Sequence, residues 1–204
     1  MKTQLYNFTN KTIWISTLLV MLMTQGCSNE NSSDNQAPQT NTNVPVTEAN
    51  KPQAPAMDIH TAVISNNIEA IKQHIASGSD LNQKDPFGGS SPLITAALFE
   101  KTDIVKLLIE AGADINFTNN DGSTALHTAA FFCRPEIVKL LLANGSDKTI
   151  INKMGATAYD SVAGEFKTIK PAYDMLGQSL APMGLVLDYD QLKKTRPIIA
   201  EILK

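Results

Sequence analysis

Residues 91–147 contain two copies of one sequence unit. The first copy has SPLITAA at 91–97, IVKLL at 104–108 and GADIN at 112–116, and the second has TALHTAA at 124–130, IVKLL at 137–141 and GSD at 145–147. Equivalent positions such as Leu93 and Leu126, or Gly112 and Gly145, are separated by 33 residues. A fixed period of this length predicts supersecondary units that stack on one another and share a continuous core.

The repeated unit resembles the ankyrin repeat. In that family a β-turn precedes a T-P-L-H-x-A segment that opens a first helix, and a second helix ends in G-A-D-x-N. The resemblance implies an all-α solenoid of helix-turn-helix pairs with β-turn or hairpin tips. It also implies that the chain binds other proteins through a concave face, which the tips and the exposed ends of the first helices line.

The 33-residue spacing predicts about four repeats, at residues 57–90, 91–123, 124–156 and 157–204. Gly78 and Gly112 lie 34 residues apart, so we place one extra residue in the tip at 87–89. In repeat four, RPIIAEIL at 196–203 parallels RPEIVKLL at 134–141 with an offset of 62, and 62 minus 33 leaves 29 residues. We therefore predict an insertion at about 164–194, with a short helix near 171–180 and an extended segment near 185–189. The insertion could cap the apolar face of the last repeat or dock a partner.

Three residues stand where the family has a glycine between its two helices. They are Asn66, Glu100 and Cys133. Asn tolerates the left-handed backbone conformation, whereas Glu and Cys adopt it at a cost. Repeats two and three are therefore expected to be strained at these corners, or to end their first helices differently.

Residues 1–27 have the features of a signal peptide. Lys2 and Lys11 precede an apolar run at 13–23 that is too short to span a bilayer as a permanent helix. The run ends in TQGC at 24–27, which resembles a bacterial lipobox although Thr24 replaces the usual Leu. The resemblance implies a lipid on Cys27 and, because Ser28 follows it, an outer-membrane lipoprotein facing the periplasm. The alternative is ordinary secretory cleavage, which would give a soluble periplasmic or secreted protein.

Residues 28–56 are predicted to form a disordered tether. Their composition is dominated by Asn, Ser, Thr, Gln, Pro and Ala, and they cannot bury enough apolar surface to offset the entropy of ordering. The folded domain is expected to occupy residues 57–204. Lipidation of Cys27 would leave Cys133 as a lone thiol, so we expect no intramolecular disulfide.

The sequence favours no enzymatic activity, no cofactor and no metal. The net charge of −3 supplies no basic stripe for nucleic acid. No nucleophile and base occur at a spacing that the repeats would bring together, and no phosphate-binding loop is present. Of the three histidines, His60 and His127 take equivalent positions two repeats apart, and His74 is expected on a solvated helix face. Cys133 is expected to be an inert, small apolar side chain.

Candidate contact residues follow from the resemblance. Leu98 and Phe99 in repeat two, and Phe131 and Phe132 in repeat three, take the variable positions at the ends of the first helices. The tips carry Phe87, Asn120, Asp121, Lys153 and Met154. Phe87, Phe99 and Phe132 are the favoured anchors, because binding energy concentrates in aromatic side chains. Leu98 and Phe131 could instead turn into the core, and the insertion could fold over this face and hide it.

We therefore expect a monomeric, membrane-tethered module that binds another protein without catalysis. One role is that of a scaffold or stabiliser of an envelope protein. The alternative is an inhibitor or immunity-type protein that blocks a toxin or a hydrolase.

Overall fold

A computed structural model describes residues 52–204 of the chain. The predicted signal peptide, the lipidation of Cys27 and most of the predicted tether lie outside these described residues. Within 52–204 the regular structure is helical, and none of these helices is long and apolar enough to cross a membrane. The helices are α1 (Ile59–Ile64), α2 (Ile68–Ser77), α3 (Pro92–Leu98), α4 (Thr102–Glu110), α5 (Ala125–Phe131), α6 (Pro135–Ala143), α7 (Asp160–Ala163), α8 (Phe166–Leu180), a 3₁₀ turn η1 (Ala181–Met183) and α9 (Tyr189–Leu203).

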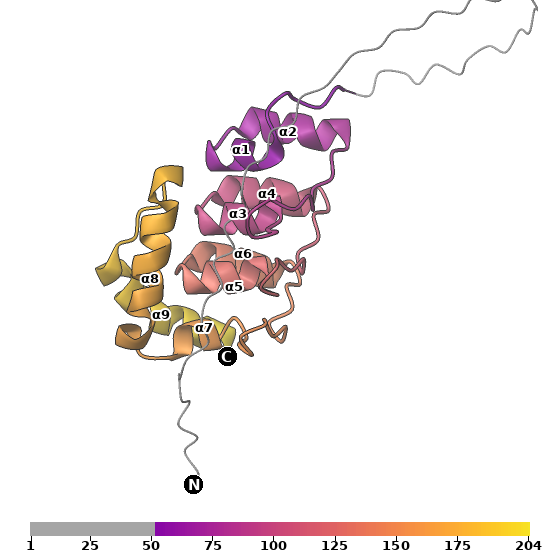
Figure 1. The fold of residues 1–204 in the computed structure, drawn as a ribbon. Helices are drawn as coiled ribbons and strands as arrows, with labels where there is room; N and C mark the ends of the chain where they lie inside the picture. Colours follow the sequence, from indigo (N-terminus) through magenta and orange to yellow (C-terminus); the bar gives the residue numbers. More distant parts are fainter. Residues whose placement is uncertain (1–51) are drawn as a thin grey trace, which may run out of the picture. The chain divides into compact units, whose positions relative to one another are not determined.

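The helices pair and stack as the 33-residue period predicts (Figure 1). The pairs α1/α2, α3/α4 and α5/α6 lie one above another, and the loops that join successive pairs project on one side of the stack. The fourth pair consists of α7 and α9, which contact each other and also pack on α5 and α6. Helix α8 lies between α7 and α9 in the sequence. The predicted ankyrin solenoid of about four repeats, with the last repeat interrupted, is confirmed.

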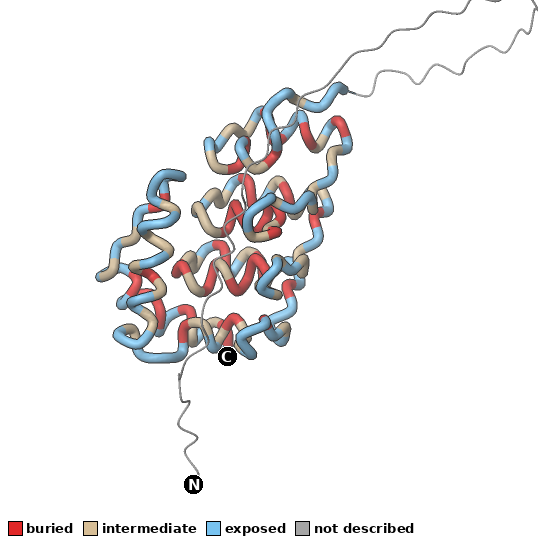
Figure 2. The backbone as a smooth tube through the Cα atoms, viewed as in Figure 1, coloured by how far each residue is buried: buried red, intermediate tan, exposed pale blue. Residues whose placement is uncertain are grey.

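Apolar side chains at helical spacing form one continuous core between the stacked pairs (Figure 2). Equivalent positions of successive repeats are fully buried, such as Ile71, Val105 and Val138 in the second helices. All the buried side chains of this core lie between Ile59 and Leu203. Because the described residues contain a continuous core of their own, we expect residues 47–204 to fold without the rest of the chain.

Polar side chains link each repeat to the next. The side-chain oxygen of Asn82 accepts a hydrogen bond from the backbone N–H of Asp114 at 2.9 Å, and Asn116 accepts one from Asp147 at 2.9 Å. His60 lies 2.9 Å from the carbonyl oxygen of Gln83, and His127 lies 3.1 Å from that of Ala156. The two histidine contacts hold the first and third tips against the helix pairs before them, and the two asparagine contacts join the segments that follow successive second helices.

His74 does not lie on a solvated face, contrary to expectation. It is buried, with Nε2 2.9 Å from the carbonyl oxygen of Met57 and Nδ1 3.0 Å from the Ser79 hydroxyl. The segment before α1 therefore covers one side of α2, which the helical pattern alone does not reveal.

The stability of the domain should decrease as the pH falls below about 6.5, because of His127. Its Nδ1 lies 2.9 Å from the Thr124 hydroxyl at the start of α5. Burial lowers the pKa of His127 below its ordinary value of 6.5, although the hydrogen bond to Ala156 opposes this shift. The unfolded chain therefore takes up a proton more readily than the folded one, and the stabilisation by the neutral ring is present above pH 6.5 and lost below it.

Urea unfolding of residues 47–204 at about pH 8 and about pH 5 measures this effect. His127→Gln should flatten the pH dependence in this range, because its side chain does not titrate. An unchanged slope in this variant would assign the dependence to other groups.

The three corners that lack glycine are left-handed. Asn66, Glu100 and Cys133 have φ values of 56°, 57° and 56°. The expected strain is therefore present in repeats two and three, where Glu100 and Cys133 adopt a conformation that costs about 1 kcal/mol in a residue with a Cβ atom. The packed helices on either side impose it.

The insertion differs from its predicted form. Helix α8 begins at Phe166, five residues before the predicted start, and α9 begins at Tyr189, whereas the repeat register placed the last helix near Arg196. Asp188 explains the early start of α9, because its side chain accepts hydrogen bonds from the N–H groups of Asp190 and Gln191. Pro197, which the register placed in the first turn, lies inside α9 instead.

The insertion also does not cover the end of the solenoid. Figure 1 shows α8 running beside the stack, on the side opposite the tips. An open pocket of about 400 Å³ remains against α7 and α9, lined in part by Tyr159, Val162 and Ala200. The insertion therefore packs on the side of repeat three and does not cap the end of the solenoid.

Candidate protein-binding surface

The three tips between successive helix pairs share one internal design. Backbone hydrogen bonds close them from Asp85 to Ser90 at 2.9 Å, from Asn119 to Ser123 at 3.0 Å and from Asn152 to Ala156 at 3.0 Å. The first tip is one residue longer than the others, which confirms the predicted position of the extra residue. In each tip the first side chain accepts hydrogen bonds from N–H groups further along the turn. The backbone of each tip is therefore rigidly held.

In the first tip, hydrogen bonds within the turn stabilise the ionised side chain of Asp85. Partial burial by itself raises the pKa of Asp85, but hydrogen bonds from the N–H groups of Gly88, Phe87 and Ser90 outweigh it, and the pKa lies below the ordinary value of 3.8. The carboxylate therefore stays ionised at neutral pH and keeps Phe87 at the outer end of the turn.

The tips are also joined to one another. The N–H of Asn120 donates to the carbonyl oxygen of Gly88 at 2.9 Å, and the N–H of Lys153 donates to that of Asp121 at 2.8 Å. Three turns from three different repeats thus form one connected row. A partner that binds the row needs little ordering of the chain, which lowers the entropic cost of binding.

This row presents large apolar side chains to solvent. Phe87 in the first tip is 89% exposed and Met154 in the third is 78% exposed. Between them lie Asn120 and Asp121, and Lys153 precedes Met154; all three are exposed. Exposed apolar side chains on a rigid backbone, with polar groups beside them, are typical of protein-binding sites. The structure brings these five predicted residues together in one surface, which we call the tip row.

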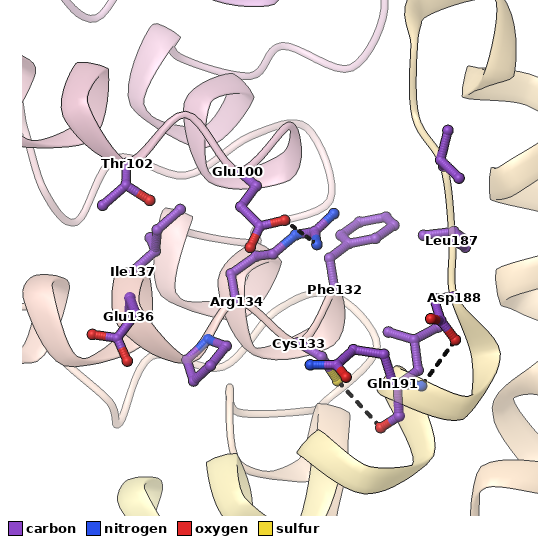
Figure 3. Close-up of a pocket in the computed structure, with 13 residues that line it drawn as sticks. Glu100, Thr102, Phe132, Cys133, Arg134, Glu136, Ile137, Leu187, Asp188 and Gln191 are labelled. Carbon is purple, nitrogen blue, oxygen red and sulfur yellow. Dashed lines mark hydrogen bonds and ion pairs between the residues drawn. The ribbon is translucent and has the colours of Figure 1, made fainter.

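The predicted residues of the first helices are placed differently. Leu98 and Phe99 are half-buried at the end of α3, and Phe131 is half-buried at the end of α5. Phe132 is only 6% exposed, so its prediction as an exposed anchor is wrong. Figure 3 shows its ring pointing toward Leu187, in the segment that returns from α8 to α9. The insertion hides this position, and its apolar content was the sequence signal for that outcome.

Tyr173 holds the insertion against repeat three. Its ring is fully buried and packs on Phe131 with centroids 4.6 Å apart, and its hydroxyl donates a hydrogen bond to the carbonyl oxygen of Phe131. Arg196 in α9 donates to the same hydroxyl at 3.0 Å, to the carbonyl oxygen of Ser161 at 3.0 Å and to that of Gly164 at 3.1 Å. The buried guanidinium of Arg196 therefore links α9 to α7, to the segment that follows α7 and to α8.

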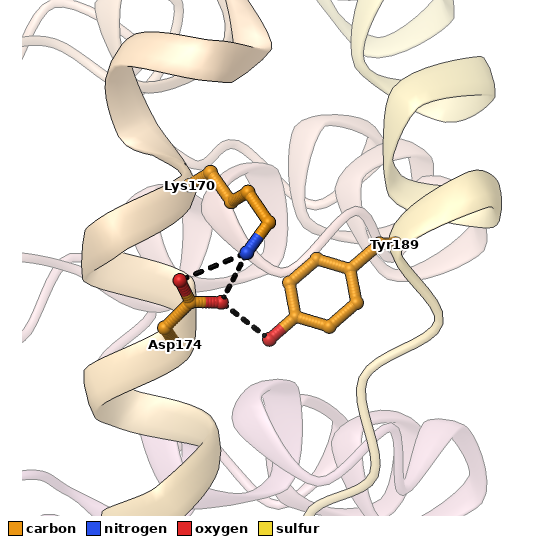
Figure 4. Close-up of polar contacts among 3 residues, drawn as sticks. All are labelled: Lys170, Asp174 and Tyr189. Carbon is orange, nitrogen blue, oxygen red and sulfur yellow. Dashed lines mark hydrogen bonds and ion pairs between the residues drawn. The ribbon is translucent and has the colours of Figure 1, made fainter.

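A second polar cluster fixes α8 to the start of α9 (Figure 4). Lys170 contacts the Asp174 carboxylate at 2.8 and 2.9 Å, and the hydroxyl of Tyr189 donates to it at 2.9 Å. The hydrogen bond from Lys170 is the main reason that the pKa of Asp174 is lowered. Because this cluster is exposed, it orients α8 more than it stabilises the fold.

Cys133 has a buried thiol of low reactivity. Burial raises the pKa of the Cys133 thiol to about 11, so it stays protonated at neutral pH and is a poor nucleophile. Residues 52–204 contain no cluster of three or more His, Cys, Asp or Glu side chains suited to a metal ion.

The family model described as ankyrin repeats in three copies matches residues 59–152. Residues 59–152 are ankyrin repeats. The chain is 41% identical over 64 residues to protein phosphatase 1 regulatory subunit 27 from Homo sapiens, which is 31% of this chain and 41% of that protein. The Mus musculus protein of the same name is 39% identical over 64 residues, again 31% of this chain and 41% of that protein.

Two further similarities concern repeats in larger proteins. Inversin from Gallus gallus is 34% identical over 61 residues, which is 30% of this chain and 6% of inversin. The solved ankyrin repeat domain of Bcl-3, a member of the IkappaB protein family, matches with a TM-score of 0.49 and 30% identity, over 50% of this chain and 45% of that one. The chain thus spans less than half the length of each of these relatives. Because ankyrin repeats bind other proteins, this part of the chain is a protein–protein interaction module.

Proposed function

We propose that this chain is a non-catalytic scaffold or stabiliser of another protein in the bacterial cell envelope. In this proposal the lipid on Cys27 tethers it to the outer membrane, residues 28–56 act as the tether, and the ankyrin domain binds its partner in the periplasm as a monomer. The observation that carries the proposal is the tip row, where hydrogen bonds between repeats hold Phe87 and Met154 exposed on a rigid backbone.

The relatives named as phosphatase regulatory subunits support a non-catalytic role. Their names describe proteins that act on an enzyme without being the catalytic chain. The match covers about two repeats of this chain, so it supports the mode of action and does not name the partner.

Replacing Phe87 and Met154 with Ser should weaken partner binding by about tenfold or more. Both side chains are exposed, so the free energy of unfolding should change by less than about 0.5 kcal/mol for each. The test is co-purification from envelope extract with the lipidated chain, followed by titration of the purified partner against both forms. The matched control is Ile198→Ser, because Ile198 is 57% exposed on α9, outside the tip row.

Retention by the control and loss by the tip variant in unstressed cells would support a resident envelope partner. Equal binding by both variants would move the binding site away from the tips. A partner present only under stress would instead favour the inhibitor or immunity role.

Replacing Cys27 with Ala should move the chain from the membrane fraction to the soluble periplasmic fraction. The expected cause is loss of the acyl chains, each buried CH₂ of which contributes about 0.8 kcal/mol to membrane binding. Fractionation and the mass of the N-terminal peptide measure this effect, with Cys133→Ser as the control for loss of a thiol. Membrane association that survives Cys27→Ala in a chain whose N-terminal mass shows that residues 1–26 have been removed would contradict the lipid anchor.

A further inference from the structure

Asn144 and Gly145 form the only Asn-Gly dipeptide in the sequence. In such a dipeptide the backbone nitrogen of the glycine can attack the side-chain amide carbon of the asparagine, because glycine has no Cβ atom to hinder the approach. A C–N bond forms, ammonia leaves, and water then opens the cyclic imide to give aspartate or isoaspartate. The attack requires that the Asn144 side chain and the Gly145 nitrogen are both free to move.

Neither group is free at the closed end of α6. The side-chain nitrogen of Asn144 donates a hydrogen bond back to the carbonyl oxygen of Leu140 at 2.8 Å. The N–H of Gly145 donates to the carbonyl oxygen of Leu142 at 3.1 Å, and Gly145 has a φ of +85°, as is usual for the left-handed residue that ends a helix. Both reacting groups are therefore held in other hydrogen bonds while the helix end is closed.

The segment that follows is fixed by two neighbouring parts of the fold. The N–H of Asp147 donates to the side-chain oxygen of Asn116 at 2.9 Å, and Lys148 donates to the carbonyl oxygen of Leu203 in α9 at 3.2 Å. Asn144 is itself exposed, so water reaches it without unfolding of the core. Because helix ends can open while the rest of a domain stays folded, the protection of Asn144 depends on these local contacts.

We propose that Asn144 is a deamidation site controlled by the end of α6. The closed end protects it, and local opening lets the imide form. The product carries a carboxylate at the negative end of the helix dipole and has lost the donor to Leu140, so the modified end closes less well. Residues 145–152 lead from this point to the third tip, and the modification therefore weakens the support of Met154. This step needs only water and does not depend on a partner for the tip row.

Deamidation is measured on residues 47–204 in buffer and in guanidinium chloride at the same mildly alkaline pH. The tryptic peptide 140–148 contains Asn144 as its only asparagine, so its mass gives the rate. The rate should be at least about tenfold lower in buffer. Asn116→Ala removes the contact to Asp147 and should raise the rate in buffer about fivefold. Asn82→Ala is the matched control: it removes the same contact one repeat earlier, to the N–H of Asp114 at 2.9 Å, and should change the rate less than about twofold.

Two substitutions at the site measure the consequence of the modification. Asn144→Ala cannot deamidate and gives α6 the same end as α4, where Ala111 precedes Gly112. Asn144→Asp has the side chain of one product and should unfold about 2–4 °C below Asn144→Ala. Equal rates in buffer and denaturant, or equal acceleration by Asn82→Ala and Asn116→Ala, would overturn the proposal. Equal unfolding midpoints of the two Asn144 variants would also overturn it.

Discussion

Replacing Tyr173 with Ala should lower the free energy of unfolding of residues 47–204 by about 3–5 kcal/mol. The ring is fully buried between Phe131 and Phe166, with centroid distances of 4.6 and 5.8 Å. Its removal leaves a cavity and also leaves the carbonyl oxygen of Phe131 and one donor of Arg196 without their partner. Urea unfolding measures the loss, and limited proteolysis should show new cleavage between residues 164 and 188.

Tyr173→Phe separates the two contributions. It keeps the ring and removes the hydroxyl, so the expected loss is about 1–3 kcal/mol, the cost of unsatisfied buried polar groups. If Tyr173→Ala destabilised the domain no more than a typical surface substitution, then the insertion would not be docked on repeat three.

Replacing Gly122 with Ala should destabilise the domain by about 2–3 kcal/mol. Gly122 has a φ of +74°, and an added Cβ would lie 3.3 Å from the backbone nitrogen of Lys153 and 3.4 Å from Cα of Asn152. The left-handed conformation accounts for about 1 kcal/mol, and the remainder comes from pushing the third tip away from the second. The same displacement should weaken the hydrogen bond from Lys153 to Asp121 and so disturb the tip row.

Gly155→Ala is the matched control. Gly155 has a φ of +76° in the third tip, but nothing lies within 4 Å of an added Cβ. The expected loss is therefore only about 1 kcal/mol. Thermal or urea unfolding of the two variants gives the comparison, and equal losses would show that the tips are not in close contact.

The repeat architecture could be predicted because it depends on local and periodic signals. The spacing of Leu93 and Leu126 predicted the stacking. In the structure the side chains of Ser91 and Thr124 cap the starts of α3 and α5. Glu100 and Cys133 stand where the family pattern has a glycine, so strain at these corners was one of the two expected outcomes, and their positive φ values agree with it.

The packing of the insertion could not be predicted in the same way. It has no repeat partner in the sequence, and the Phe132 ring points toward a residue more than 50 positions away, Leu187. The start of α9 was misplaced because Arg196 and Pro197 copy the opening of α6, while the capping side chain of Asp188 starts the helix earlier. Arg196 became the buried link to Tyr173, a role that the repeat pattern does not contain.

Site-specific photo-cross-linking in living cells tests the central claim that the tip row binds a partner protein. A photoreactive residue is placed separately at Phe87 and Met154, with Val186 and Ile198 as exposed controls outside the tip row. The account predicts that one envelope protein cross-links from positions 87 and 154 and not from 186 or 198. Cross-links from 198 or 186 alone, with none from the tips, would contradict it.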